Sequence, residues 1–172
     1  MEHNMKTLKH SVMTLAIAGL MASSFAAAAS GNSPKTISVI QISSQSAFEL
    51  AKEAVQQCEQ KGYQVTATVV DVTGNVIAQL RADNAGRHTL ESSRQKAFTA
   101  ASMKQPTAKL MKMIADKPFL QPLKDMDDNL LLLAGGLPLT ANNTVIGAIG
   151  VGGAPGGHLD VQCAEAAIAK VL

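Results

Sequence analysis

A glycine-rich stretch near the C-terminal end constrains the fold of this chain more than any other feature. Residues 134–160 read AGGLPLTANNTVIGAIGVGGAPGGHLD, and eight of these 27 residues are glycine. No Gly-Lys-Ser/Thr step of a phosphate-binding loop follows, and Pro155 stands where a dinucleotide fingerprint needs its third glycine. Apolar strand formers over 145–151 argue against a linker. Glycine in a strand marks either tight packing or close approach of a ligand, so both interpretations stay open, with Gly152 and Gly153 as candidate contacts.

The remaining pattern predicts one α+β domain. The expected elements are a helix from 46 to a stop at Gly62, a hairpin with strands at 63–70 and 76–82, helices at 89–104 and 107–115, strands at 130–134, 137–140 and 144–151, and a last helix from 160. Ser46 and Glu49 have capping-box spacing, and Thr107 and Asp160 can cap their helices. This order favours a mostly antiparallel sheet over strict β-α-β alternation.

The N-terminal segment has the three parts of a secretory signal peptide. Lys6 and Lys9 precede an almost wholly apolar run over 12–22, and small residues follow at 26–29. The apolar run is shorter than the roughly 20 residues of a membrane span. We therefore expect a signal peptide at 1–29, a polar lead-in at 30–42, a folded domain at 43–172 without a membrane span, and a periplasmic or secreted protein.

Two cysteines, Cys58 and Cys163, fall in the expected domain. Cys58 lies on the apolar stripe of the first helix, and Cys163 lies beside that of the last helix. An exported protein meets an oxidising compartment, and both helices can pack on one face of the sheet. We expect a disulfide between them; two buried thiols are the alternative.

Charge and aromatic content exclude one class of partner. The formal net charge is +2, and the chain has no Trp, one Tyr and four Phe. A nucleic-acid-binding surface needs a basic patch or a base-stacking platform. We expect no nucleic-acid partner.

Five segments in register resemble the GlcG/HbpS-type haem-binding family, also called the DUF336 or haem-degrading domain and related to the C-terminal domain of PduO-type proteins. These segments are VTATVVDVTGNVIAQLRAD at 65–83, SSRQKAFTAA at 92–101, PT at 106–107, GGLPL at 135–139 and VIGAIGVGGAPGGHLD at 145–160. The resemblance spans about residues 43–172 and is closest to the secreted branch. It implies a five-stranded antiparallel sheet flanked by helices, a homo-oligomer, and haem or another tetrapyrrole as ligand.

The candidate site residues are histidines, basic residues and one threonine. Imidazole is the commonest protein ligand of haem iron, which makes His88 and His158 candidate iron ligands. Basic side chains can hold propionates or a small organic acid; the candidates are Arg81, Arg87, Arg94 and Lys96, and a solvated basic face is the alternative. The resemblance adds Thr107, as a pocket contributor or helix cap. Met103, Met111 and Met113 have core spacing, although thioether is also an axial ligand.

Two departures from the family pattern affect these candidates. The family's DGA-like position reads Asp83-Asn84-Ala85 here, and His158 interrupts the usual glycine-to-aspartate step. No nucleophile–base–acid arrangement is apparent, so the sequence leaves open whether haem is carried, sensed or degraded. We expect an exported haem-binding protein. The alternatives are a small-carboxylate-binding enzyme or sensor domain and a ligand-free structural subunit of an oligomer.

Overall fold

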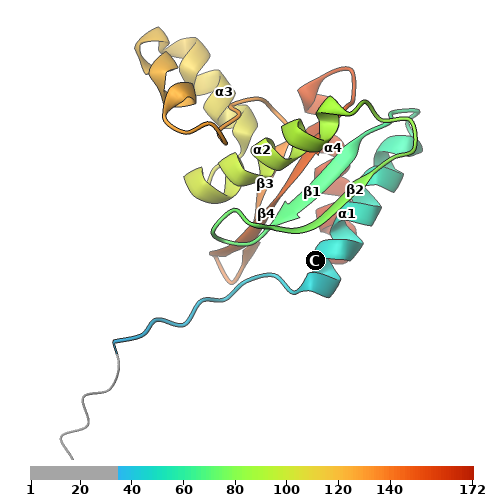
Figure 1. The fold of residues 1–172 in the computed structure, drawn as a ribbon, viewed down its shortest axis with the longest axis horizontal. Helices are drawn as coiled ribbons and strands as arrows, with labels where there is room; N and C mark the ends of the chain where they lie inside the picture. The colour runs from blue at the N-terminus through green and yellow to red at the C-terminus, as the bar shows by residue number, and fades with distance from the viewer. Residues whose placement is uncertain (1–34) are drawn as a thin grey trace, which may run out of the picture. The chain divides into compact units, whose positions relative to one another are not determined.

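Four antiparallel strands form the central sheet of the computed structural model, which describes residues 35–172 (Figure 1). The spatial order is β2-β1-β4-β3. The strands are β1 (Thr66–Val70), β2 (Val76–Arg81), β3 (Gly136–Ala141) and β4 (Thr144–Gly152). Both sequential pairs are hairpins, and β1 and β4 pair in the middle, with Thr68 opposite Gly150. The predicted signal peptide and residues 30–34 of the lead-in lie outside the described residues.

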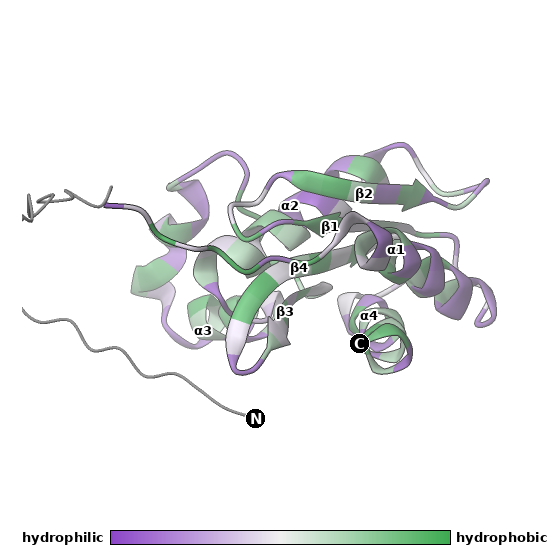
Figure 2. Cartoon of the chain, turned by 90° about the horizontal axis from the view of Figure 1, so that it is seen from below, coloured by the Kyte–Doolittle hydropathy of each residue, from purple (hydrophilic) through white to green (hydrophobic). Residues whose placement is uncertain are grey.

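Helices cover both faces of this sheet. The helices are α1 (Ser44–Glu59), α2 (His88–Met103), α3 (Thr107–Asp116), the 3-10 helix η1 (Pro118–Asp125) and α4 (Gly157–Val171). Figure 2 shows the sheet between α2 on one side and α1 with α4 on the other. This confirms the predicted α+β class and antiparallel sheet, and residues 38–172 form one compact unit.

The predicted strand at 130–134, and with it the five-stranded sheet, is wrong. Residues 130–134 pair with no strand. Gly135 accepts one hydrogen bond from the amide of Val151 in β4, and β3 begins at Gly136. Leu130 and Leu132 are buried because they pack with Leu110 of α3 in a small core beside the sheet. A short apolar run indicates burial but does not distinguish a central strand from a buried connection.

Three predicted caps are also wrong. The N-cap of α1 is Ser43, whose hydroxyl accepts from the amide of Ser46 at 3.1 Å. Thr107 is the first residue of α3, and its hydroxyl accepts from the amide of Gly136 at 2.8 Å instead of capping the helix. Asp160 lies inside the first turn of α4, after an N-cap at Gly156. A neighbouring serine, Ser43, takes the cap position predicted for Ser46. The side chains of Thr107 and Asp160 form tertiary hydrogen bonds instead of capping their helices.

The face of the sheet under α2 is built from small and hydroxyl-bearing side chains. Thr68 of β1 hydrogen-bonds to Ser93 of α2 at 2.7 Å, and Thr66 bonds to Thr89 at 2.7 Å. A methyl group on Gly150 would overlap the backbone of α2 at residues 93 and 97. Gly150 allows the helix backbone to lie directly against the strand. At this position the glycine therefore serves tight packing and not the approach of a ligand.

The opposite face holds the larger aliphatic core. Leu50 of α1 and Ile149 of β4 are fully buried there, together with Val65, Val69 and Leu139. Cys58 of α1 and Cys163 of α4 are also fully buried and form the predicted disulfide, with 5.4 Å between their Cα atoms. The bond ties the first and last helices of the described chain together.

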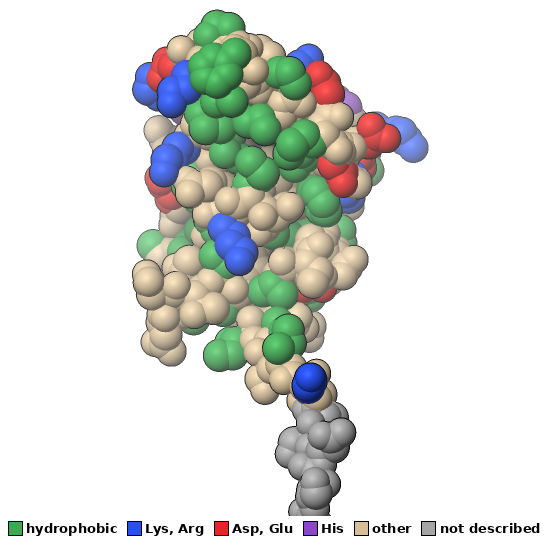
Figure 3. All heavy atoms as spheres, turned by 90° about the vertical axis from the view of Figure 1, so that its left-hand side faces the viewer, with side chains coloured by type: hydrophobic (Ala, Val, Ile, Leu, Met, Phe, Trp, Pro, Cys, Tyr) green, Lys and Arg blue, Asp and Glu red, His purple; other side chains and the backbone are tan. Residues whose placement is uncertain are grey.

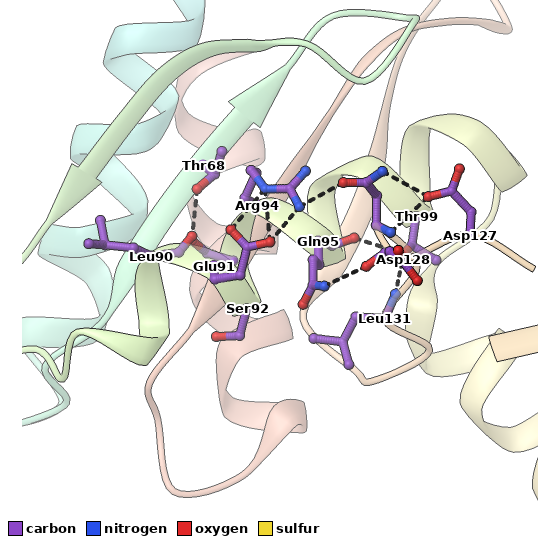
Figure 4. A network of polar contacts seen from close by, with 12 residues as sticks. Thr68, Leu90, Glu91, Ser92, Arg94, Gln95, Thr99, Asp127, Asp128 and Leu131 are labelled. Atoms are coloured by element: carbon purple, nitrogen blue, oxygen red, sulfur yellow. Dashed lines mark hydrogen bonds and ion pairs between the residues drawn. The ribbon is translucent and has the colours of Figure 1, made fainter. Parts of the chain in front are cut away.

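A polar network fixes the connection that follows η1 to the outer side of α2 (Figure 4). Arg94 donates to Glu91 and, at 2.9 Å, to the side-chain oxygen of Asn129. Gln95 donates to the carbonyl of Asp128 at 2.9 Å, and the hydroxyl of Thr99 accepts from the amide of residue 131 at 2.8 Å. These bonds replace the strand pairing that the apolar run at 130–134 lacks.

Candidate functional site

A cleft of about 460 Å³, called the polar cleft because four polar side chains line it, opens where β4 ends and the glycine-rich loop 153–157 begins. His88, Ser92 and Lys96 of α2 form one wall. Its other lining residues are Leu133, Gly153, Ala154, Pro155, Gly156, Gly157 and Asp160. The cleft therefore brings together three residues selected from the sequence, namely His88, Lys96 and Gly153.

A buried ion pair forms the floor of the polar cleft. The Lys96 ammonium lies 2.8 Å from a carboxylate oxygen of Asp160 and donates to the carbonyl of Val151 at 2.9 Å; both side chains are only 3% exposed. The other carboxylate oxygen accepts from the amide of Ala154 at 3.0 Å. Burial raises the pKa of Asp160, and the Lys96 charge opposes that rise. The pair therefore anchors the glycine-rich loop to α2 and α4.

A second, apolar cleft of about 290 Å³ adjoins the first. The two clefts share Leu133 and Gly157 as lining residues. The others are Ala108 and Met111 of α3, Ala134, and His158 and Val161 of α4. Leu133 is 45% exposed and Met111 is 38% exposed. A ligand with an apolar body and acidic groups would find both environments side by side.

Each cleft carries one exposed histidine in the same local setting. His88 is the first residue of α2, two residues after Gly86, and His158 is the second residue of α4, two residues after Gly156. A methyl group on either glycine would lie within 3 Å of its imidazole ring. Neither imidazole hydrogen-bonds to another residue of the described chain. The two ring nitrogens of each are therefore available as ligands.

The four basic candidates do not gather at one place. Lys96 is buried and neutralised by Asp160. Arg94 is held by Glu91 and Asn129 on the outer side of α2, and this hydrogen-bonded pair lowers the pKa of Glu91. Arg81 and Arg87 are exposed at the end of β2 and just before α2. Only the last two keep a guanidinium that is not engaged elsewhere in the described chain.

Thr107 and the strand glycines have structural partners. Thr107 is fully buried, with its hydroxyl against the backbone of Gly136. A methyl group on Gly152 would contact the hydroxyl of Ser92 at 2.8 Å, so this glycine packs against α2. Gly153 has a left-handed φ of +132° and begins the loop that lines the polar cleft.

Three residues that line the clefts have other predicted roles. Asp160 is predicted as a helix cap, whereas it pairs with Lys96, which is 64 residues away. The spacing of Met111 favours the core, with a thioether ligand as the alternative, whereas Met111 is partly exposed in the apolar cleft. Leu133 is predicted in a strand, whereas it lies in the connection before β3.

The side chains available as metal ligands limit which metals the two clefts can bind. Within residues 35–172, no group of three or more His, Cys, Asp or Glu side chains is arranged to hold a metal ion. A bare ion needs four or more ligands, whereas haem iron already has four porphyrin nitrogens and takes one or two axial ligands. Isolated imidazoles beside an apolar cleft therefore fit haem. No helix in this part of the chain is long and apolar enough to cross a membrane.

Comparison with known proteins gives the family. The model of the haem-degrading protein HbpS-like family matches residues 42–169. A double mutant of HbpS from Streptomyces reticuli is 34% identical, covering 94% of this chain and 99% of that one, with a TM-score of 0.75. The structure of a PduOC:heme complex is 26% identical over 76% of this chain and 94% of that one, with a TM-score of 0.69. An uncharacterised 15.0 kDa protein of Citrobacter freundii is 32% identical over 60% of this chain and 76% of its own length. The chain belongs to the HbpS-like haem-degrading protein family.

Proposed function

We propose that this protein binds haem or a closely related tetrapyrrole in the two adjoining clefts beside the glycine-rich loop. The observation that carries the proposal is the contact between an apolar cleft and a polar one, each with an exposed histidine. A tetrapyrrole has a flat apolar body with acidic side groups. The apolar cleft suits the macrocycle, and the polar cleft suits its propionates.

The family supports this ligand. Its matching model describes haem-degrading proteins, and one related structure is a complex with haem. We further propose that the protein is exported to the periplasm or outside the cell and that it works there as a homo-oligomer in haem sensing, storage or breakdown. The predicted signal sequence and the buried disulfide support export, because disulfides persist in oxidising compartments.

The second candidate, a site for a small organic acid, has weaker support. A carboxylate clamp needs a free cation, and the cation in the polar cleft is already paired with Asp160. An organic acid entering the polar cleft would meet the Lys96–Asp160 pair, whose net charge is close to zero and attracts an anion only weakly. Of the side chains lining the polar cleft, His88 is the one left to pair with a propionate or another acid.

A hemin titration of the purified protein with its disulfide intact tests the proposal. We expect a saturable shift of the Soret band at about one haem per chain, because the clefts form one site in each protomer. A broad rise without saturation would contradict haem binding. Thermal shift against small carboxylic acids would then separate the acid-binding candidate from a ligand-free structural subunit.

A further inference from the structure

We propose that His158 and Met111 supply the two axial ligands of the haem iron, and that His88 does not ligate it. This inference rests on the proposed function and specifies its metal contacts. It concerns a histidine that departs from the family pattern. The same cleft holds both residues, with His158 on α4 and Met111 on α3.

The Cε1–Nδ1 edge of the His158 ring lies next to Gly156. The Cε1 and Nδ1 atoms lie 2.8 and 2.9 Å from the position that a Cβ atom on residue 156 would occupy, whereas Nε2 lies 3.9 Å away. Nε2 therefore lies farther from the loop, and it is a common metal-binding atom of histidine. His88 has the same relation to Gly86, so the choice between the two histidines rests on their surroundings.

The surroundings of His158 are those of a haem ligand. Ala108, Leu133, Ala134 and Val161 complete the apolar cleft around His158 and Met111. A thioether and an imidazole together are a known axial pair for haem. Met111 is 38% exposed, so part of its side chain is accessible from the cleft.

His88 lies in a different chemical environment. Its cleft contains Ser92 and the Lys96–Asp160 pair and no sulfur ligand. The polar side chains of this cleft suit the acidic side groups of the ligand better than its apolar macrocycle. We therefore assign His88 to the propionate side of the ligand, where an imidazole N–H can donate to a carboxylate.

Two matched pairs of variants test the assignment in hemin titrations, with absorbance and electron paramagnetic resonance spectra as readouts. We expect His158→Ala to lower the affinity for hemin at least about tenfold, the loss of one metal–ligand bond being worth more than about 1.4 kcal/mol. Its iron should lose the low-spin signature. We expect His88→Ala, which removes a proposed propionate contact, to weaken hemin binding but to leave the bound iron low-spin.

Substitutions at two glycines supply the second pair of variants, because an added methyl group displaces the neighbouring imidazole ring without removing it. Gly156 has an extended backbone with φ of −155°, so alanine is tolerated there. We expect Gly156→Ala to displace the His158 ring and to alter the spectrum part of the way towards that of His158→Ala. Gly86→Ala should displace His88 and leave the iron spectrum unchanged.

Met111→Leu keeps an apolar side chain of similar size and removes the thioether. We expect hemin to bind with the iron shifted to high spin and without its sulfur-to-iron charge-transfer band. An unchanged spectrum would overturn the methionine half of the assignment, and a wild-type spectrum in His158→Ala would overturn the histidine half. Failure of the wild-type protein to bind hemin would instead overturn the proposed function. Thermal unfolding of the ligand-free variants controls for folding, since His88, Met111 and His158 are exposed.

Discussion

The two faces of the sheet are held by different chemistry. Under α2 the strands present Thr66, Thr68, Ala148 and Gly150, and the helix lies close enough for hydroxyl groups to bond across the interface. Under α1 and α4 the core is aliphatic, and a disulfide links the two helices. The α2 face depends on close approach and buried polar contacts, whereas the other face depends on apolar area and a covalent bond.

This difference bears on where a ligand can bind. The strand glycine at 150 is occupied by the backbone of α2, which leaves no room for a ligand against the middle of β4. The glycines that remain accessible lie past the end of the strand, in the loop from Gly153 to Gly157. The sheet is thus the scaffold, and the exposed ends of α2, α3 and α4 carry the site.

A third apolar region belongs to neither face. Hydrophobic side chains gather on the surface over α3 and η1 (Figure 3). Phe119 is 76% exposed and Met126 is 61% exposed, and they line a shallow cleft of about 150 Å³ with Leu120, Pro122 and Leu123. These residues belong to η1 and the residue that follows it, directly after α3, which carries Met111.

The largest effect is expected from breaking the ion pair on the α2 side. Lys96→Met removes the ammonium and leaves the Asp160 carboxylate buried without a counter-charge. Removing one partner of a buried pair typically costs about 3–5 kcal/mol. We expect a loss of that size in the free energy of unfolding at neutral pH, measured by urea denaturation.

The same variant has a defined pH dependence. Burial raises the pKa of Asp160 from its ordinary 3.8, and without Lys96 it would rise further. A folded-state pKa above the unfolded value means that the folded protein binds the proton more tightly. Its stabilising contribution is present below the unfolded pKa and is lost as the pH rises through the folded one. The deficit of Lys96→Met should therefore shrink as the pH falls towards 3.8, and Lys96→Met/Asp160→Asn should be more stable than Lys96→Met. A deficit that does not change with pH would show that desolvation of the carboxylate is not its origin.

An intermediate effect is expected on the opposite face. Replacing Cys58 and Cys163 together by alanine removes a link across 105 residues. The usual range for disulfides gives a loss of about 2–4 kcal/mol in the free energy of unfolding. Calorimetry of the oxidised protein, the reduced protein and the double variant checks this. Reduction and substitution should agree, and a double variant as stable as the oxidised protein would contradict a stabilising role for the bond.

Local patterns in the sequence predicted most elements because their periodicity is local. The stripe that ends at Cys58, the hairpin around Gly74 and the helix that contains Cys163 all follow from spacing within one element. The disulfide followed because both cysteines lie on or beside helical stripes that pack together. The elements needed no knowledge of distant contacts, whereas the disulfide also required that the first and last helices pack on one face of the sheet.

The failures came from contacts between distant segments. A lysine is seldom buried, so nothing local marked Lys96 as the partner of Asp160. The run at 130–134 is apolar because it meets Leu110, and its strand assignment failed because the polar network to α2 takes the place of strand pairing. Both histidines selected from the sequence line the two clefts, and their role as ligands stays a prediction. The cleft around Met111 and Leu133 depends on how α3 packs beside the sheet, which local patterns do not show.

The smallest of the three stability effects tests the close approach on the α2 side. Ala148 and Gly150 face α2 from the same strand, two residues apart. Gly150→Ala forces a methyl group against the helix backbone, and such overpacking costs about 1–3 kcal/mol. Ala148→Gly should lower stability by about 1 kcal/mol, through a lost buried methyl and added strand flexibility. The exchange variant Ala148→Gly/Gly150→Ala has the wild-type composition and buried volume. If close packing at one point of the helix decides stability, the exchange variant should be at least as unstable as Gly150→Ala alone. Wild-type stability in the exchange variant would mean that only the total volume under α2 matters, and a ligand could then approach the strand at Gly150.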